Sequence, residues 1–388
     1  MSSRAPHRPN AAATATALLL LTATSAPALT DAAQDDLCPI PNELPPNFAR
    51  TCVDLGEASG DRCWITYTPP AAAATDSGVP LVVDMHGFTS CAFYNPTYTG
   101  WKERADADGF VVVYPQGTAN SDVVDATCFN AGQCCCFKDF ARVDEADDVV
   151  FLRKLVDDTV AKSEVPIDTD RIYMAGHSNG CMMAQRMGAE VSDLVAAVCC
   201  HAGVQVAYGT AEDFPAVYNG STSVLTVHGD ADDTVPYDGG GFLGFRGAED
   251  NAALWAEANG CAAGPVVIED ESGSFATHAY SDCGNDGMGE VKLIQLYGVG
   301  HAPYMTTETT PEGLGNMTDV DTTKLAQDFC FQHRLTSPSA VGPTRSPSQS
   351  PSTSQAPTQS PSTSDATSML CSTVKNVVMI LAVTLLLR

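Results

Sequence analysis

The chain is poor in positive charge and lacks the short motifs that bind catalytic metals or nucleotide phosphates. It has 388 residues, with 20 Lys and Arg against 47 Asp and Glu and a formal net charge of −27. A chain this acidic repels phosphate backbones, so we expect no nucleic-acid partner. H-E-x-x-H and paired C-x-x-C patterns are absent, and the glycine-rich run at 239–247 has no following Lys-Ser/Thr. We therefore expect no metal and no cofactor.

Cysteine, in contrast, is plentiful, and it points to an oxidising compartment. The chain has 15 cysteines, and disulfides rarely persist in a reducing cytosol. Their pairing cannot be deduced from spacing, but we expect Cys38, Cys52 and Cys63 to attach the N-terminal segment. Asn219 and Asn316 begin glycosylation sequons, which are usable only on a secreted protein.

The first 28 residues predict a secretory signal peptide. Arg4 and Arg8 lie in a basic start, and an apolar stretch follows at 11–21. Ala26 and Ala28 supply the small residues that signal peptidase requires before a cleavage site.

The far end divides into a polar linker and an apolar tail. Residues 336–366 are rich in Ser, Thr and Pro and lack the apolar side chains needed for a core, which predicts an extended linker. Within the tail at 367–388, the apolar run at 377–387 is much shorter than the roughly 20 residues of a bilayer span. Small residues, a spacer and a short apolar tail are typical of a GPI-anchor signal. A single-pass helix starting near Met369 is the alternative, which Lys375 weakens.

Residues 29–335 predict one domain in which strands and helices alternate. Such alternation indicates a mostly parallel sheet covered by helices on both faces, which binds ligands at the carboxyl ends of its strands. Buried strands are expected at 81–85, 110–114, 171–175, 194–200, 224–228 and 291–297, and helices at 100–108, 143–162, 179–190, 249–259 and 321–335.

A candidate nucleophile lies between the strand at 171–175 and the helix that follows it. Gly176-His177-Ser178-Asn179-Gly180 fits the G-x-S-x-G pattern, in which a tight turn exposes the serine hydroxyl above the sheet. The start of the helix supplies free N–H groups for a developing oxyanion. An ordinary glycine-rich turn could share the pattern, but the position of this motif between a strand and a helix favours a nucleophilic serine.

A candidate acid and a candidate base follow two later strands, in the order Ser, acid, His. Asp230, Asp232 and Asp233 all follow the strand at 224–228, and we choose Asp232 with Asp230 as the alternative. His301 follows the strand at 291–297 in a glycine-rich loop and is the candidate base.

The loop after the strand at 81–85 is the candidate second half of an oxyanion hole. His86-Gly87-Phe88-Thr89 stands where a backbone donor belongs, and we choose the N–H of Phe88, with Thr89 as the alternative. The N–H of Asn179, directly after the serine, would be the other donor.

Taken together, these blocks resemble the secreted esterase group of the α/β-hydrolases, which contains ferulic acid esterases and poly(3-hydroxybutyrate) depolymerase-like proteins. The resemblance runs from about Cys63 to Leu335. It includes Val82–Gly87, Val113–Gly117, Phe129–Gly132, Asp147-Asp148-Val149, the Ser178 turn, Val235-Pro236-Tyr237 and Gly300-His301. It implies an α/β-hydrolase fold with Ser178 as nucleophile, Asp232 as acid and His301 as base. Phe129, where the family usually has Trp, and Cys181, where it has a small residue, are departures.

The resemblance implies a secreted or surface-tethered ester hydrolase. Feruloyl esters of cell-wall polysaccharide are the expected substrate, and polyester depolymerisation is the alternative within this class. A non-catalytic adhesion protein on a hydrolase scaffold is the alternative from another class, although it would not need all three catalytic side chains. The candidate substrate-binding residues are His86, Thr89, Phe129, Asn130 and Tyr237.

Overall fold

The computed structural model describes most of the expected catalytic domain. The described residues are 38, 40–41, 43–55, 61–72, 77–120, 126–132, 134–136, 147–206, 218, 222–241, 243–284, 289–305 and 317–335. The expected signal peptide, linker, apolar tail and both sequon asparagines lie outside them. No helix in this part of the chain is long and apolar enough to cross a membrane.

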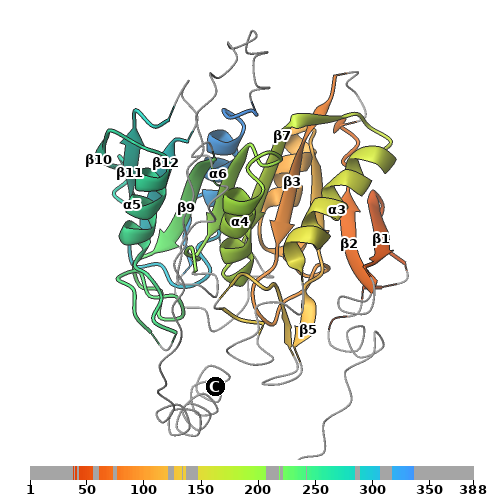
Figure 1. Ribbon diagram of the computed structural model, residues 1–388, viewed down its shortest axis with the longest axis horizontal. Coiled ribbons are helices and arrows are strands. Elements are labelled where there is room, and N and C mark those ends of the chain that lie inside the picture. The colour runs from red at the N-terminus through yellow and green to blue at the C-terminus, as the bar shows by residue number, and fades with distance from the viewer. Residues whose placement is uncertain are drawn as a thin grey trace, which may run out of the picture.

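A ten-stranded sheet runs through the molecule, with six parallel strands at its centre and two antiparallel strands at each edge (Figure 1). The parallel centre follows the order β4-β3-β7-β8-β9-β12. Its strands are β4 (Val111–Pro115), β3 (Val79–Met85), β7 (Ile167–Gly176), β8 (Ala197–His201), β9 (Ser223–Gly229) and β12 (Val291–Leu296). The edges are β1 (Phe48–Asp54) with β2 (Asp61–Tyr67), and β11 (Phe275–Ser281) with β10 (Ala263–Glu269).

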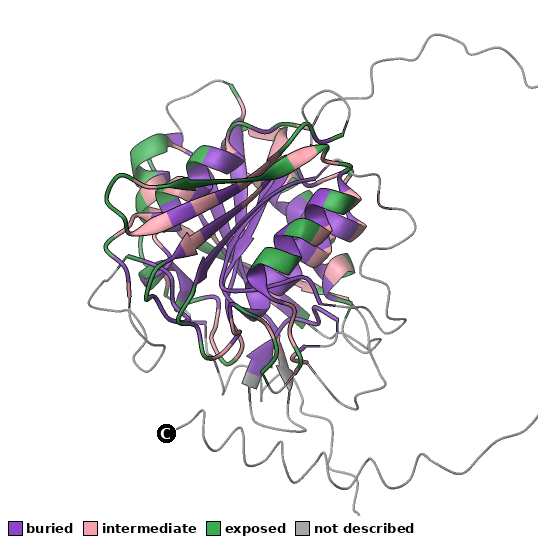
Figure 2. Cartoon of the chain, turned by 90° about the vertical axis from the view of Figure 1, so that its left-hand side faces the viewer, coloured by how far each residue is buried: buried purple, intermediate pink, exposed green. Residues whose placement is uncertain are grey.

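Helices cover both faces of the sheet, as the alternating pattern predicts. Because successive side chains of a strand point to opposite faces, Leu81 and Val83 of β3 join one core while Val82 joins the other. The first core includes residues of α3 (Asp148–Lys162), α4 (Asn179–Glu190) and α5 (Ala248–Ala258), and the second includes residues of α2 (Trp101–Asp108) and α6 (Thr322–Cys330). Figure 2 shows the buried residues gathered in the central strands and on the inner sides of the helices.

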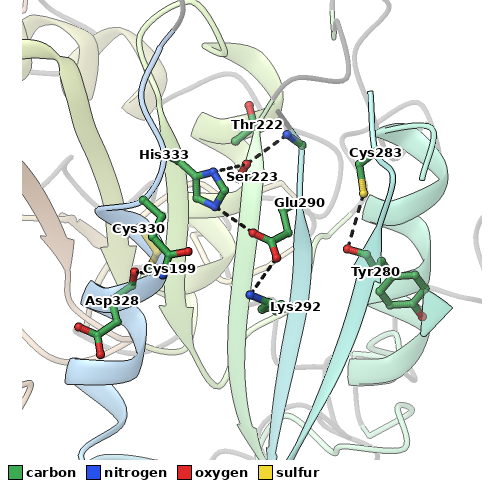
Figure 3. Close-up of polar contacts among 12 residues, drawn as sticks. Cys199, Thr222, Ser223, Tyr280, Cys283, Glu290, Lys292, Asp328, Cys330 and His333 are labelled. Atoms are coloured by element: carbon green, nitrogen blue, oxygen red, sulfur yellow. Dashed lines mark hydrogen bonds and ion pairs between the residues drawn. A yellow bond between two sulfur atoms is a disulfide. The ribbon is translucent and has the colours of Figure 1, made fainter. Parts of the chain in front are cut away.

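Disulfides fasten the two helical layers to the same strand. Cys199 and Cys200 are neighbours on β8, so their side chains leave the sheet on opposite faces. Cys200 pairs with Cys181 of α4. Cys199 pairs with Cys330 of α6, and both are labelled in Figure 3. The remaining pairs are Cys38–Cys91, Cys52–Cys63, Cys128–Cys136, Cys134–Cys135 and Cys261–Cys283. The bridges at Cys38 and Cys52 attach the N-terminal segment, as expected.

The expected central strands and helices are present, but some boundaries differ. The helix expected from 143 starts at Asp148, because the side chain of Asp147 caps it by accepting from the N–H of Val150. Asp321 caps α6 in the same way, and this helix ends at Cys330 rather than at 335. The sequence pattern did not predict the edge strands or a small hairpin of β5 (Thr118–Asn120) and β6 (Ala126–Cys128).

A second Ser-His-carboxylate set lies at the starting end of β9, where it links the end of α6 to the sheet (Figure 3). His333 Nδ1 lies 3.2 Å from Ser223 Oγ, and His333 Nε2 lies 3.4 Å from Glu290 Oε2. Lys292 Nζ lies 2.8 Å from the other oxygen of Glu290. Ser223 is completely buried, so it cannot meet a substrate, and the set is structural.

This set predicts a pH-dependent contribution to stability. The hydrogen bond with His333, joined by the contact with Lys292 and opposed by burial, lowers the pKa of Glu290 from 4.5 to about 2. A lowered carboxyl pKa stabilises the fold above the unfolded value, and this contribution is lost as the pH falls toward 2. We expect Glu290→Gln to lower the free energy of unfolding at pH 5, with a smaller difference from wild type at pH 3. Urea unfolding measures both, and a difference independent of pH would contradict the prediction.

Candidate functional site

The turn that carries Ser178 is strained and depends on small neighbours. Ser178 has a φ of 54° and a ψ of −118°, an unfavourable conformation for a residue with a Cβ. A Cβ at Gly180 would lie 2.1 Å from the carbonyl oxygen of Met85, so only glycine fits there. The N–H of Ser178 donates to the carbonyl of His201 at 2.9 Å. Strand β7 and helix α4 thus meet in a sharp turn that is held by the neighbouring strands.

The structure brings the three candidate catalytic side chains together at the carboxyl ends of β7, β9 and β12. His301 Nε2 lies 2.9 Å from Ser178 Oγ, and His301 Nδ1 lies 2.7 Å from Asp232 Oδ2. Each of the three residues is less than one tenth exposed. The distances allow the serine hydroxyl to donate to the imidazole while the opposite nitrogen donates to the carboxylate.

The geometry separates the three candidate acids. Asp230 and Asp233 are exposed, and Asp230 Oδ1 instead accepts from the N–H of Gly298 at 2.6 Å. Asp232 also accepts from the N–H groups of Thr234 and Val235, at 2.8 and 2.9 Å. Only Asp232 therefore contacts the candidate base among the three.

The surroundings of Asp232 favour the ionised form of its carboxyl group. Burial raises its pKa, but hydrogen bonds from His228 and His301 outweigh burial and hold the pKa of Asp232 well below its usual range. His228 Nε2 lies 3.3 Å from Asp232 Oδ2 and 2.8 Å from the carbonyl of Val235. A carboxylate kept charged beside an imidazole favours the protonated form of that imidazole, which a general base must adopt during turnover.

The loop after β3 lies against the serine turn. A Cβ placed on Gly87 would be 3.4 Å from Ser178 Cβ, so the backbone passes directly beside the nucleophile. The N–H of Thr89 donates to the carbonyl of Thr127 at 2.9 Å. Within the described part of the chain, the N–H groups of Phe88 and Asn179 have no such acceptor. The geometry therefore favours Phe88 over Thr89 as a donor.

His86 has a different environment from the one expected of a substrate-binding residue. Its ring is fully buried, with Nδ1 donating to the carbonyl of Gly87 at 2.7 Å and Nε2 accepting from the N–H of Gly117 at 3.0 Å. Burial lowers the pKa of His86 to about 4, so the ring stays neutral near neutral pH. Both nitrogens are occupied, and His86 therefore joins two loops instead of facing a substrate.

The other candidate substrate-binding residues also divide by exposure. Thr89 is exposed, whereas Phe129 and Asn130 are buried. Phe129 packs on His86 with ring centroids 4.8 Å apart, so stacking of a phenolic substrate on its ring is not available. Tyr237 is 7% exposed, and its hydroxyl lies 3.2 Å from Glu249 Oε1.

The segment at 128–132 is anchored to the serine turn through side chains that sequence reasoning did not assign. Asn179 uses its amide oxygen and nitrogen to bind the N–H and carbonyl of Phe129, at 2.8 and 2.9 Å. The N–H of Asn130 donates to Asp148 Oδ2 at 2.6 Å. Asp148 in turn forms a fully buried ion pair with Arg62 at 2.5 Å. The acidic pair at the start of α3 was visible in the sequence, but nothing near it indicated a partner 86 residues away.

Within the described residues, no group of three or more His, Cys, Asp and Glu side chains could hold a metal ion. The site consists of a serine, an imidazole and a carboxylate, with backbone N–H groups beside the serine.

The strand order, together with a serine in a tight turn between a central strand and a helix, defines an α/β-hydrolase fold. Residues 63–238 match the family model described as Esterase PHB depolymerase. Ser178 and Asp232 lie within the matched residues, and His301 lies beyond them. The family resemblance expected from the sequence is thereby confirmed.

Two curated relatives are 25–28% identical to this chain over the residues that align. Feruloyl esterase B of Piromyces equi is 28% identical over 247 residues, which cover 60% of this chain and 41% of that protein. Poly(3-hydroxyalkanoate) depolymerase C of Paucimonas lemoignei is 25% identical over 278 residues, covering 69% and 61%. The chain thus spans less than two thirds of either relative. Among solved structures, an acetyl xylan esterase from Aspergillus awamori is 18% identical with a TM-score of 0.48, covering 65% of this chain and 94% of that one.

Proposed function

We propose that the protein is a serine carboxylic ester hydrolase that works through an acyl-enzyme. The observation that carries the proposal is a hydrogen-bonded chain of three side chains, Ser178, His301 and Asp232, at the carboxyl ends of three strands. Ser178 Oγ lies 2.9 Å from His301 Nε2, and His301 Nδ1 lies 2.7 Å from Asp232 Oδ2. Such a hydrogen-bonded chain is the arrangement that activates a serine hydroxyl, and an adhesion protein would have no need of it.

Acyl transfer begins when Ser178 Oγ attacks the ester carbonyl while His301 Nε2 takes the hydroxyl proton. Asp232 holds the imidazole so that Nε2 faces the serine and stabilises the positive charge that the ring acquires. His301 then gives the proton to the departing alcohol. Water, activated by the same imidazole, attacks the acyl-enzyme and releases the acid.

The negative charge of each tetrahedral intermediate needs donors near Ser178. In our proposal these are the N–H groups of Phe88 and Asn179. The start of α4 adds the positive end of its dipole at Asn179. Donors that are fixed before the reaction stabilise a developing charge without having to reorganise.

We propose feruloyl esters of cell-wall polysaccharide as the substrate, with polyester as the alternative. The similarity to Feruloyl esterase B supports the first, and the similarity to Poly(3-hydroxyalkanoate) depolymerase C supports the second. Beside the serine turn, Phe88 is partly exposed and Thr89 is exposed, so both are open to a substrate that reaches Ser178.

We propose that the enzyme acts outside the cell, with 29–335 as its catalytic domain. The seven disulfides support an oxidising compartment. Secretion by the signal at 1–28, a linker at 336–366 and a GPI anchor replacing 367–388 belong to the same proposal.

The test combines an ester panel with covalent labelling. We expect hydrolysis of methyl ferulate and a short acyl ester, and a fluorophosphonate adduct on the peptide that contains Ser178. Ser178→Ala should leave the protein unlabelled although it stays folded. Attack on poly(3-hydroxybutyrate) film alone would favour the polyester alternative, and no turnover with no label would favour the adhesion protein.

A further inference from the structure

His177 is a buried histidine beside the nucleophile that the mechanism above does not use. It occupies the second position of the glycine-serine motif and is 4% exposed. Its own backbone is fixed, because its N–H donates to the carbonyl of Met85 at 3.0 Å and its carbonyl accepts from Gly180 at 2.8 Å. The ring therefore projects from a rigid part of the serine turn.

The ring of His177 reaches the loop that carries the base. His177 Nε2 lies 2.6 Å from the main-chain carbonyl oxygen of His301, and the two ring centroids are 5.0 Å apart. A carbonyl oxygen can only accept, so this nitrogen carries the proton. Burial, followed by the neighbouring His301, lowers the pKa of His177 to about 3, so the ring is neutral near neutral pH and the donor persists.

Within the described part of the chain, the carbonyl of His301 accepts a hydrogen bond from His177 and from no other donor. Gly298 begins the loop with a φ of +68°, and its N–H donates to Asp230 Oδ1 at 2.6 Å. The first half of this loop, which runs from Gly298 to His301, is joined to the loop that carries Asp232, because the carbonyl of Val299 accepts from the N–H of Ala231 at 3.0 Å. The second half, at His301 itself, meets the serine turn through His177.

We infer that His177 is a positioning residue, whose side chain sets the distance between the imidazole of His301 and the hydroxyl of Ser178. One residue then joins the nucleophile's turn to the backbone of the base. The inference rests on the proposed function. A misplacement of about 1 Å can lower a rate about 10²-fold, so a single hydrogen bond at this point has a measurable effect.

The test compares two replacements of the same ring. His177→Phe keeps a flat ring without the donor, and we expect kcat for a short acyl ester to fall roughly 10- to 100-fold while KM changes little. His177→Gln keeps an N–H donor and should recover most of kcat. His278→Phe is the matched control, because His278 is a buried histidine on the distant strand β11, where it contacts Gln295 at 3.1 Å. It should retain the wild-type kcat.

A readout without turnover separates this inference from the proposed function. We expect the N–H between His301 Nδ1 and Asp232 to give a low-field proton resonance in NMR. This resonance should shift or broaden in His177→Phe and persist in His177→Gln. Equal losses of kcat in both variants, or an unchanged resonance and kcat in His177→Phe, would overturn the inference. A wild-type protein that shows the resonance but hydrolyses no ester would refute the proposed function alone.

Discussion

Asp232→Asn is expected to lower kcat for ester hydrolysis about 10⁴-fold, because an amide at this position favours the wrong imidazole tautomer. In the structure, Asp232 Oδ2 accepts from His301 Nδ1 at 2.7 Å, which leaves Nε2 free to take the proton of Ser178. An asparagine that turns its NH₂ toward Nδ1 would make that nitrogen an acceptor and place the ring proton on Nε2. The serine would then face a donor instead of a base.

Asp230→Asn is the matched control for this prediction. Asp230 is two residues away on the same loop, but it is exposed and contacts the N–H of Gly298 rather than the imidazole. We expect its replacement to change kcat by less than about threefold, since exposed substitutions away from the reacting groups have small effects. Steady-state kinetics on a short acyl ester measures both variants. Equal rates for the two would show that Asp232 is not the acid of the triad.

Asp148→Ala is expected to lower the free energy of unfolding by about 3–5 kcal/mol, because it leaves the buried guanidinium of Arg62 without its carboxylate. Both side chains of this pair are 0% exposed, so water cannot replace the lost partner. The same change removes the acceptor for the N–H of Asn130. Urea unfolding monitored by tryptophan fluorescence measures the loss.

Two further variants check the cause of that loss. Asp193→Ala breaks an exposed ion pair with Arg153, and it should cost less than about 1 kcal/mol. Replacing both members of the buried pair, with Arg62→Met and Asp148→Leu, should recover most of the stability, since no charge is then buried. A double variant as unstable as Asp148→Ala would mean that the unpaired charge is not the main cause.

Local pattern was sufficient for the centre of the fold. The apolar run at 81–85 and the serine motif at 176–180 each have their neighbours close in sequence, so their strand and turn could be predicted. Among the edge strands that were missed, β10 lacks this signal, because every residue after Ala263 is exposed and no buried stripe marks the strand. The start of α3 was misplaced because a capping carboxylate, rather than the apolar stripe, ends the preceding loop.

The sequence by itself determined the alternation of the central strands and helices, the serine turn, and which aspartates and histidines could serve a serine. A strand, a helix or a tight turn depends on residues close together in the chain, and so its signal can be read locally. Only the tertiary structure distinguished Asp232 from Asp230 and showed that His86 and Phe129 are buried. It alone also placed His177 beside the carbonyl of His301. Those outcomes depend on contacts between segments up to 124 residues apart. Burial and hydrogen-bond geometry across such separations arise only when the sheet is assembled.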